Sequence, residues 1–203
     1  MRRLRSLLRL SADDSAFTLV ELLIYCLLMA AIVAVAGSIL ITSLRGQSDI
    51  ANSANGNNNG QLISQSISGG IQSATYIRVT TISATSQLLV VANPGLGATP
   101  STRCEAWYFT TDNGGAVYTL TSSSDILVPT LTALTTQWRL LATGIGKSTR
   151  SGAPSAMLTT SGIPVTSVSY EFTMADGSGR PILISSSATS RQAIALLGST
   201  LCI

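Results

Sequence analysis

The sequence predicts an α+β protein, in which a long N-terminal helix, transmembrane in its first part, packs on an antiparallel β-sheet head. Two observations support this class. Residues 22–44 carry no charged side chain, and an apolar run of that length can cross about 30 Å of hydrocarbon as a helix. The remainder contains short β-branched and aromatic runs between Gly, Asn and Asp turns, which are typical of antiparallel strands.

The first 16 residues read as a basic leader. Four of the 12 basic residues of the chain lie within its first ten positions: Arg2, Arg3, Arg5 and Arg9. Positive charge ahead of a spanning helix keeps that end in the cytoplasm, which places the rest of the chain outside. A secretory signal peptide is the rival interpretation, but its apolar core is shorter and its cleavage site follows that core. Here the small residues Ser15 and Ala16 precede the apolar run, so cleavage there would leave the helix on the mature chain.

A short basic leader followed by AFTLVELL and an apolar helix resembles the precursors of type IV pilins and pseudopilins. The resemblance implies that a membrane aspartyl peptidase cleaves between Ala16 and Phe17 and methylates the new amino terminus on Phe17. Members of this family usually have Gly where this chain has Ala16. The resemblance divides the chain into four segments: a cleaved leader (1–16), a transmembrane polymerisation helix (17–44), an extracytoplasmic continuation of that helix (45–75) and a β-rich head (76–203). The segments CEAWYF, QWRLLATG and ISSSATSRQ also resemble the PilW-like minor pilins of Gram-positive type.

Glu21 is out of place in this apolar run. A carboxylate at the centre of a membrane helix costs roughly 2.5–3.5 kcal/mol on insertion scales, so it needs a positive partner. Cleavage before Phe17 would create an amine four residues away on the same helix face. That amine would neutralise Glu21 within one chain or, as the resemblance implies, in an adjacent subunit of a polymer. The alternative is a tolerated polar residue in an uncut anchor.

The helix is expected to continue beyond the bilayer to about residue 75. Apolar residues recur there at spacings near those of one helical stripe: Ile50, Leu62, Ile63, Ile67 and Ile71. Between them, residues 52–60 read NSANGNNNG, a sequence of poor helix formers. Two interpretations remain open. Residues 52–60 either break the helix and give it flexibility, or are held helical by the packed segment that follows.

The remainder of the chain reads as β-strands. Short strands are predicted at 86–94 and 137–143, and hairpins at 104–122 and 165–190, with Asp-Asn-Gly-Gly and Ala-Asp-Gly-Ser-Gly as their turns. In the second hairpin, apolar residues alternate with polar ones and are expected to face the core: Val168, Tyr170, Phe172 and Met174.

The three cysteines divide between the two parts of the chain. Cys26 lies in the apolar run, whereas Cys104 and Cys202 lie in the polar remainder. If the helix spans the membrane, Cys104 and Cys202 share an oxidising compartment and can form a disulfide. Two small buried thiols are the alternative.

The sequence predicts no catalytic, cofactor-binding or metal-binding residue, and the chain is not expected to be an enzyme. It has no histidine, which removes Ser-His and Cys-His catalysis and the usual zinc ligand sets. The segment GIGKST (144–149) has Leu141 where a phosphate-binding loop needs glycine, and is read as a surface loop. The two glycine-rich turns lack the oxygen pattern of a calcium loop. Four aromatic residues could form a stacking surface for sugars or bases, but they are expected to pack in the core instead: Trp107, Tyr108, Phe109 and Trp138.

These features predict a minor type IV prepilin, a structural subunit that polymerises through its helix. The expected partners are a prepilin peptidase and methyltransferase, other pilin subunits in a hetero-polymer, the pilus assembly platform and membrane lipid. The chain would first be a single-pass protein of the cytoplasmic (inner) membrane with its head outside, and then part of a surface pilus. The alternatives are a pseudopilin of a type II secretion or DNA-uptake system, and a membrane-anchored extracellular adhesin that does not polymerise. The basic residues after the leader are scattered, so no specific nucleic-acid partner is predicted.

Overall fold

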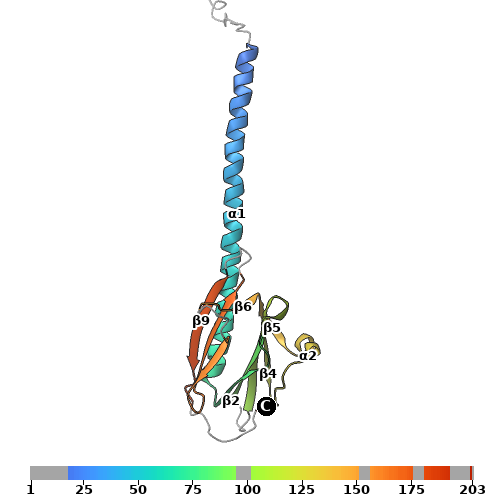
Figure 1. The fold of residues 1–203 in the computed structure, drawn as a ribbon, viewed down its shortest axis with the longest axis vertical. Coiled ribbons are helices and arrows are strands. Elements are labelled where there is room, and N and C mark those ends of the chain that lie inside the picture. Colours follow the sequence, from blue (N-terminus) through green and yellow to red (C-terminus); the bar gives the residue numbers. More distant parts are fainter. Residues whose placement is uncertain (1–17, 95–101, 151–155, 176–180, 193–201, 203) are drawn as a thin grey trace, which may run out of the picture. The chain divides into compact units, whose positions relative to one another are not determined.

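The structure is a computed structural model that describes residues 18–94, 102–150, 156–175, 181–192 and 202. The chain divides into two compact units, Met1–Gln47 and Ser48–Ile203. The boundary lies inside the first helix, so the first unit contributes its apolar part. The second unit holds the rest of that helix together with all the strands (Figure 1). A long apolar N-terminal helix and an antiparallel β-sheet head are therefore present, and the predicted α+β class is confirmed.

Helix α1 runs without interruption from Leu19 to Gln72, a length of 54 residues. Residues 52–60 are helical, in agreement with the second of the two interpretations left open by the sequence. Gly56 and Gly60 in this stretch are buried, and a Cβ added to Gly60 would lie 2.5 Å from Cδ1 of Ile184. Close packing of these glycines compensates for their poor intrinsic helix propensity.

The predicted apolar stripe is only partly correct. Ile63, Ile67 and Ile71 are fully buried and follow one another at intervals of four residues, as one helix face requires. Ile50 and Leu62 are wrongly placed in that stripe, because their side chains are 72% and 47% exposed. The helix ends at Gln72, three residues before the expected end, and the chain then turns to enter the first strand.

The larger sheet has five strands in the order β1-β2-β3-β4-β5, each antiparallel to its neighbours. Its hairpin of β3 and β4 confirms the first predicted hairpin, with Tyr108 opposite Tyr118. The turn between them requires left-handed backbone at Asn113, Gly114 and Gly115, with φ of 53°, 87° and 76°. The strands are β1 (Tyr76–Thr81), β2 (Ser86–Pro94), β3 (Thr102–Thr110), β4 (Ala116–Ser122) and β5 (Arg139–Thr143).

The smaller sheet is built around β8, which pairs with β9 along its whole length. Two shorter strands, β6 and β7, pair with different ends of β8. The hairpin of β8 and β9 confirms the second predicted hairpin, although its turn at 176–180 lies outside the described residues. The predicted alternation is also confirmed, because Val168, Tyr170, Phe172 and Met174 are all buried. The strands are β6 (Ile145–Lys147), β7 (Leu158–Ser161), β8 (Ser167–Met174) and β9 (Ile182–Thr189).

The sequence did not predict β1, β7 or the short helix α2 (Leu131–Thr136). The surface-loop interpretation of 144–149 is wrong for its central part, since residues 145–147 form β6. These elements are short. The strands among them form because they pair with segments that are distant in the sequence, so the local sequence does not reveal them. Lys147, for example, lies opposite Phe172.

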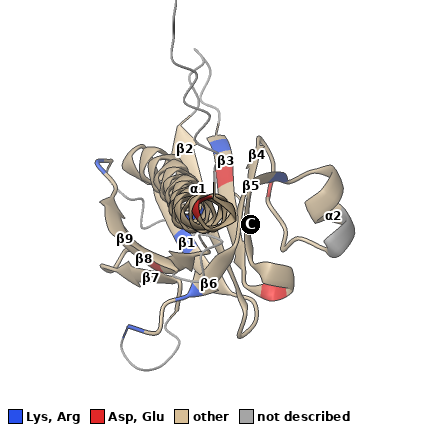
Figure 2. Ribbon diagram, turned by 90° about the horizontal axis from the view of Figure 1, so that it is seen from above, with Lys and Arg blue, Asp and Glu red and all other residues tan. Residues whose placement is uncertain are grey.

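Two clusters of buried side chains cover the two faces of the larger sheet, which explains why β2 is buried on both sides. On one face, Ile63, Ile67 and Ile71 of α1 pack with residues of both sheets. Figure 2 shows β7, β8 and β9 of the smaller sheet side by side, and β3, β4 and β5 of the larger sheet likewise. On the other face, Trp138, Ile126 and the Cys104–Cys202 disulfide form the second cluster.

Candidate functional site

The apolar segment of α1 in the first unit is the surface that most clearly requires a partner. Every described residue from 18 to 47 is exposed except Gly37 and Gly46, which are half-buried. The large apolar side chains from Leu19 to Leu44 are between 52% and 78% exposed. By length and composition this helix can cross a membrane. Burial of each such side chain is worth about 1.5–3 kcal/mol, so covering this surface with lipid or with other helices would stabilise the chain.

Glu21 lies in the first turn of this helix. The turn is capped by Thr18, whose Oγ1 accepts a hydrogen bond from the backbone N–H of Glu21 at 3.3 Å. Thr-x-x-Glu is the spacing of a capping box, in which the acidic or amide side chain usually reaches back to the cap residue. Here the Glu21 carboxylate instead accepts a hydrogen bond from a tyrosine one turn later, with Tyr25 Oη 3.4 Å from Glu21 Oε1.

Positive charge is far from Glu21 along the described part of the helix. Between residues 18 and 47 the charged side chains are Glu21 and Arg45. A separation of 24 positions corresponds to about 36 Å along an α-helix, beyond the reach of any ion pair. The predicted partner, the amine of Phe17, and the predicted cleavage residue Ala16 both lie outside the described residues. The pairing of Phe17 with Glu21 therefore stays a prediction.

The other predicted site is the disulfide, and it is confirmed. Cys104 on β3 and Cys202 are bonded, with their Cα atoms 5.5 Å apart. Both are buried in the second cluster, and the backbone N–H of Ile126 donates to the Cys202 carbonyl at 3.3 Å. The bridge thus ties Cys202 to β3, the middle strand of the larger sheet. Cys26 is free and exposed on α1.

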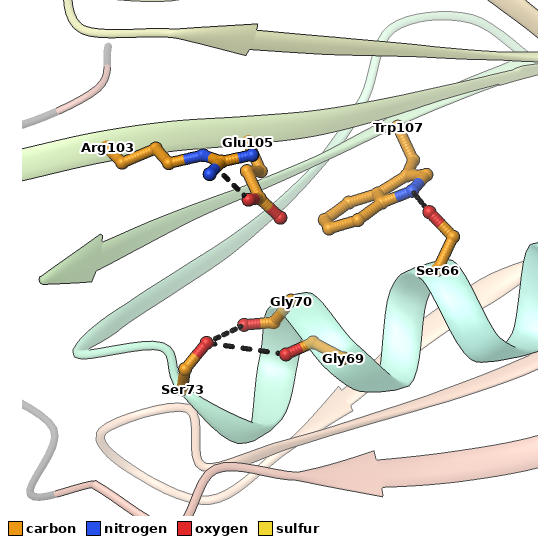
Figure 3. A network of polar contacts seen from close by, with 7 residues as sticks. All are labelled: Ser66, Gly69, Gly70, Ser73, Arg103, Glu105 and Trp107. Atoms are coloured by element: carbon orange, nitrogen blue, oxygen red, sulfur yellow. Dashed lines mark hydrogen bonds and ion pairs between the residues drawn. The ribbon is translucent and has the colours of Figure 1, made fainter. Parts of the chain in front are cut away.

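A polar network joins the end of α1 to the larger sheet (Figure 3). The indole Nε1 of Trp107 donates to Ser66 Oγ at 2.9 Å. The Trp107 ring lies against Gly70, where an added Cβ would come within 2.2 Å of ring atom Cη2. On the same face of β3, Arg103 and Glu105 form an ion pair of 3.1 Å. The contacts of Trp107 with Ser66 and Gly70 fix the rotation of the helix end against the larger sheet.

Sequence reasoning correctly placed Trp107, Phe109 and Trp138 in the core, where each is at most 6% exposed. It did not identify Tyr25 or Gly70 as contact residues. The signal for Tyr25 was its spacing of four from Glu21, which places both on one helix face. Gly70 had no such signal, because the Trp107 ring that requires it comes from a distant strand.

Among the described residues, no three His, Cys, Asp or Glu side chains are grouped so as to hold a metal ion. No family model, curated protein or solved structure matches this chain.

Proposed function

We propose that this chain is a minor type IV prepilin, cleaved before Phe17, N-methylated there and assembled into a surface pilus through its apolar helix. The observation that carries the proposal is the combination of an exposed apolar helix with one carboxylate in its first turn. A simple membrane anchor has no need of that carboxylate, whose nearest cation in the described part of the helix is Arg45. A subunit whose helix meets the amino termini of other subunits would use it.

The physical logic follows from the change of environment. In the bilayer, lipid covers the apolar side chains of residues 19–44. In a pilus, the corresponding helices of other subunits would cover the same side chains, which keeps their burial energy. Helix packing of this kind has little preference for one axial register. An ion pair between Glu21 and the Phe17 amine of a neighbour would supply that register, because unpaired charge in apolar surroundings is costly.

The proposal places the chain first in the cytoplasmic membrane, with its N-terminus in the cytoplasm and its head outside. Its partners would be the prepilin peptidase and methyltransferase, the assembly platform and other pilins. A pseudopilin of a secretion or DNA-uptake system would share all of these features except the length and location of the polymer. A non-polymerising adhesin would share the anchor and the head alone.

Co-purification with filaments tests the proposal, with Glu21→Gln as the informative variant. Glutamine serves in a capping box as well as glutamate does, so this change removes the charge and keeps the helix start. Wild-type chain should be found in sheared filaments, whereas Glu21→Gln should insert in the membrane yet be depleted from them. Asp49→Asn, which also removes one acidic charge from α1, is the matched control and should assemble normally. Wild-type chain that stays wholly in the membrane fraction of filament-bearing cells would contradict the proposal.

A further inference from the structure

We propose that Tyr25 is a positioning residue for Glu21: its hydroxyl holds one carboxylate oxygen, and the other is left to meet the amino group of a second subunit. The inference deepens the proposed function and rests on it. The partner it specifies is a protonated amine on the apolar helix of another pilin.

The geometry follows from the direction of helical side chains. Tyr25 is one turn after Glu21, and side chains on a helix lean toward its N-terminus. The phenol therefore reaches back over the preceding turn, where Tyr25 Oη lies 3.4 Å from Glu21 Oε1. By the same rule the Glu21 side chain leans toward the N-terminal end of α1. Glu21 and Tyr25 share one helix face at a spacing of four.

The chemistry makes this arrangement useful. An ionised carboxylate has two oxygens and about four lone-pair sites, and hydrocarbon offers no water to fill them. The backbone N–H of Glu21 is already used by the carbonyl and hydroxyl of Thr18, at 2.9 and 3.3 Å. Tyr25 supplies a neutral donor that satisfies Oε1 without cancelling the negative charge. The full charge remains to attract an amine, for which Oε2 would be the acceptor.

Tyr25 is 52% exposed, so its ring extends over the helix surface that another helix would cover. The phenol would both fix the carboxylate and contact the neighbour. An aromatic side chain with a terminal hydroxyl suits this position, because the ring stays in apolar surroundings while the hydroxyl bonds to Glu21.

The test is a double-mutant cycle on the full-length chain in filament-producing cells, comparing wild type, Tyr25→Phe, Glu21→Gln and the double variant. The measurement is the ratio of subunit in sheared filaments to subunit in membranes. Tyr25→Phe removes one oxygen atom and keeps the ring. The bond is present in the membrane as well as in the filament, so assembly loses only the ordering of the carboxylate before the neighbour binds, and the ratio should fall about three- to tenfold. In the Glu21→Gln background the same change should alter the ratio by less than about twofold, because the charged acceptor is gone.

A second measurement does not depend on assembly. In lipid bilayers, the carboxyl ¹³C resonance of Glu21 in the full-length chain should shift on Tyr25→Phe, and should stay unchanged on Tyr118→Phe, a hydroxyl removed from the head. An unchanged Glu21 resonance in the Tyr25→Phe chain would overturn the inference. So would an equal fall in filament content in both backgrounds, since that would assign Tyr25 to helix packing alone.

The outcomes also separate this inference from the proposed function. If Glu21→Gln is depleted from filaments and Tyr25→Phe assembles normally, the charge pair stands and the role of Tyr25 is refuted. If Glu21→Gln itself assembles normally, the charge pair and the inference built on it both fail.

Discussion

Alanine at Gly70 should destabilise the head, whereas alanine at its neighbour Gly69 should not. The two glycines lie in the same late turn of α1, so the gain in helix propensity is similar for both, at up to about 1 kcal/mol. A Cβ at Gly69 has no neighbour within 4 Å. A Cβ at Gly70 would lie 2.2 Å from Trp107 Cη2 and 3.1 Å from Cζ2. Carbon atoms pack best at about 3.5–4.0 Å, so the ring or the helix would have to move by more than about 1 Å.

Trp107 has little freedom to move. The residue is 1% exposed, and its indole N–H is held by Ser66. Overpacking a rigid core site costs about 1–3 kcal/mol. The gain in helix propensity is the same in both variants. The free energy of unfolding of Gly70→Ala should therefore be lower than that of Gly69→Ala by about 1–3 kcal/mol. For a chain of this size the difference corresponds to a Tm gap of about 2–4 °C per kcal/mol.

Thermal or urea unfolding of the full-length chain in detergent measures this gap. Tryptophan fluorescence is a direct probe, because the chain has two tryptophans and both are in the core. Gly69→Ala is the control for helix propensity and for any effect of the detergent. Equal stabilities of the two variants would show that the Trp107 ring does not lie against Gly70, and the packing of α1 on β3 described here would be refuted.

Three further changes probe the head by the same unfolding assay. Ser66→Ala should cost about 1–2 kcal/mol, because the Trp107 N–H loses its acceptor in a mostly buried site; stability equal to wild type would argue against that hydrogen bond. Replacing both Cys104 and Cys202 with alanine opens a loop of 98 residues and should cost up to about 4–5 kcal/mol in the chain-entropy model; an unchanged unfolding midpoint would contradict it. Phe172→Ala should cost about 3–5 kcal/mol at a fully buried site, whereas Leu127→Ala, at a side chain 77% exposed, should cost less than about 0.5 kcal/mol.

The sequence was most informative where structure depends on neighbouring residues. Both hairpins follow from local turn chemistry and alternation, and the transmembrane run follows from an absence of charge. The continuity of α1 through residues 52–60 could not be decided locally. Helix propensity argued against it, whereas burial of Gly56 and Gly60, the latter against Ile184 of β9, favours it. That contact joins positions more than 100 residues apart.

The residues of the candidate site were likewise only partly predictable from the sequence. Glu21 could be identified because a carboxylate in an apolar run is anomalous by composition alone. Tyr25 could not, since tyrosine is unremarkable in a membrane helix until its hydroxyl is found beside Glu21. Cys104 and Cys202 were paired on the ground of a shared compartment, and the fold brings their Cα atoms to 5.5 Å.

The proposed function requires two steps: processing of this chain at its amino terminus, and its incorporation into a polymer. Mass spectrometry of the sheared filament fraction tests both steps at once. The subunit recovered from filaments should begin at N-methylated Phe17 and contain the Cys104–Cys202 bridge. Recovery of a chain that retains residues 1–16, or absence of the chain from filaments that are otherwise intact, would refute the proposed function.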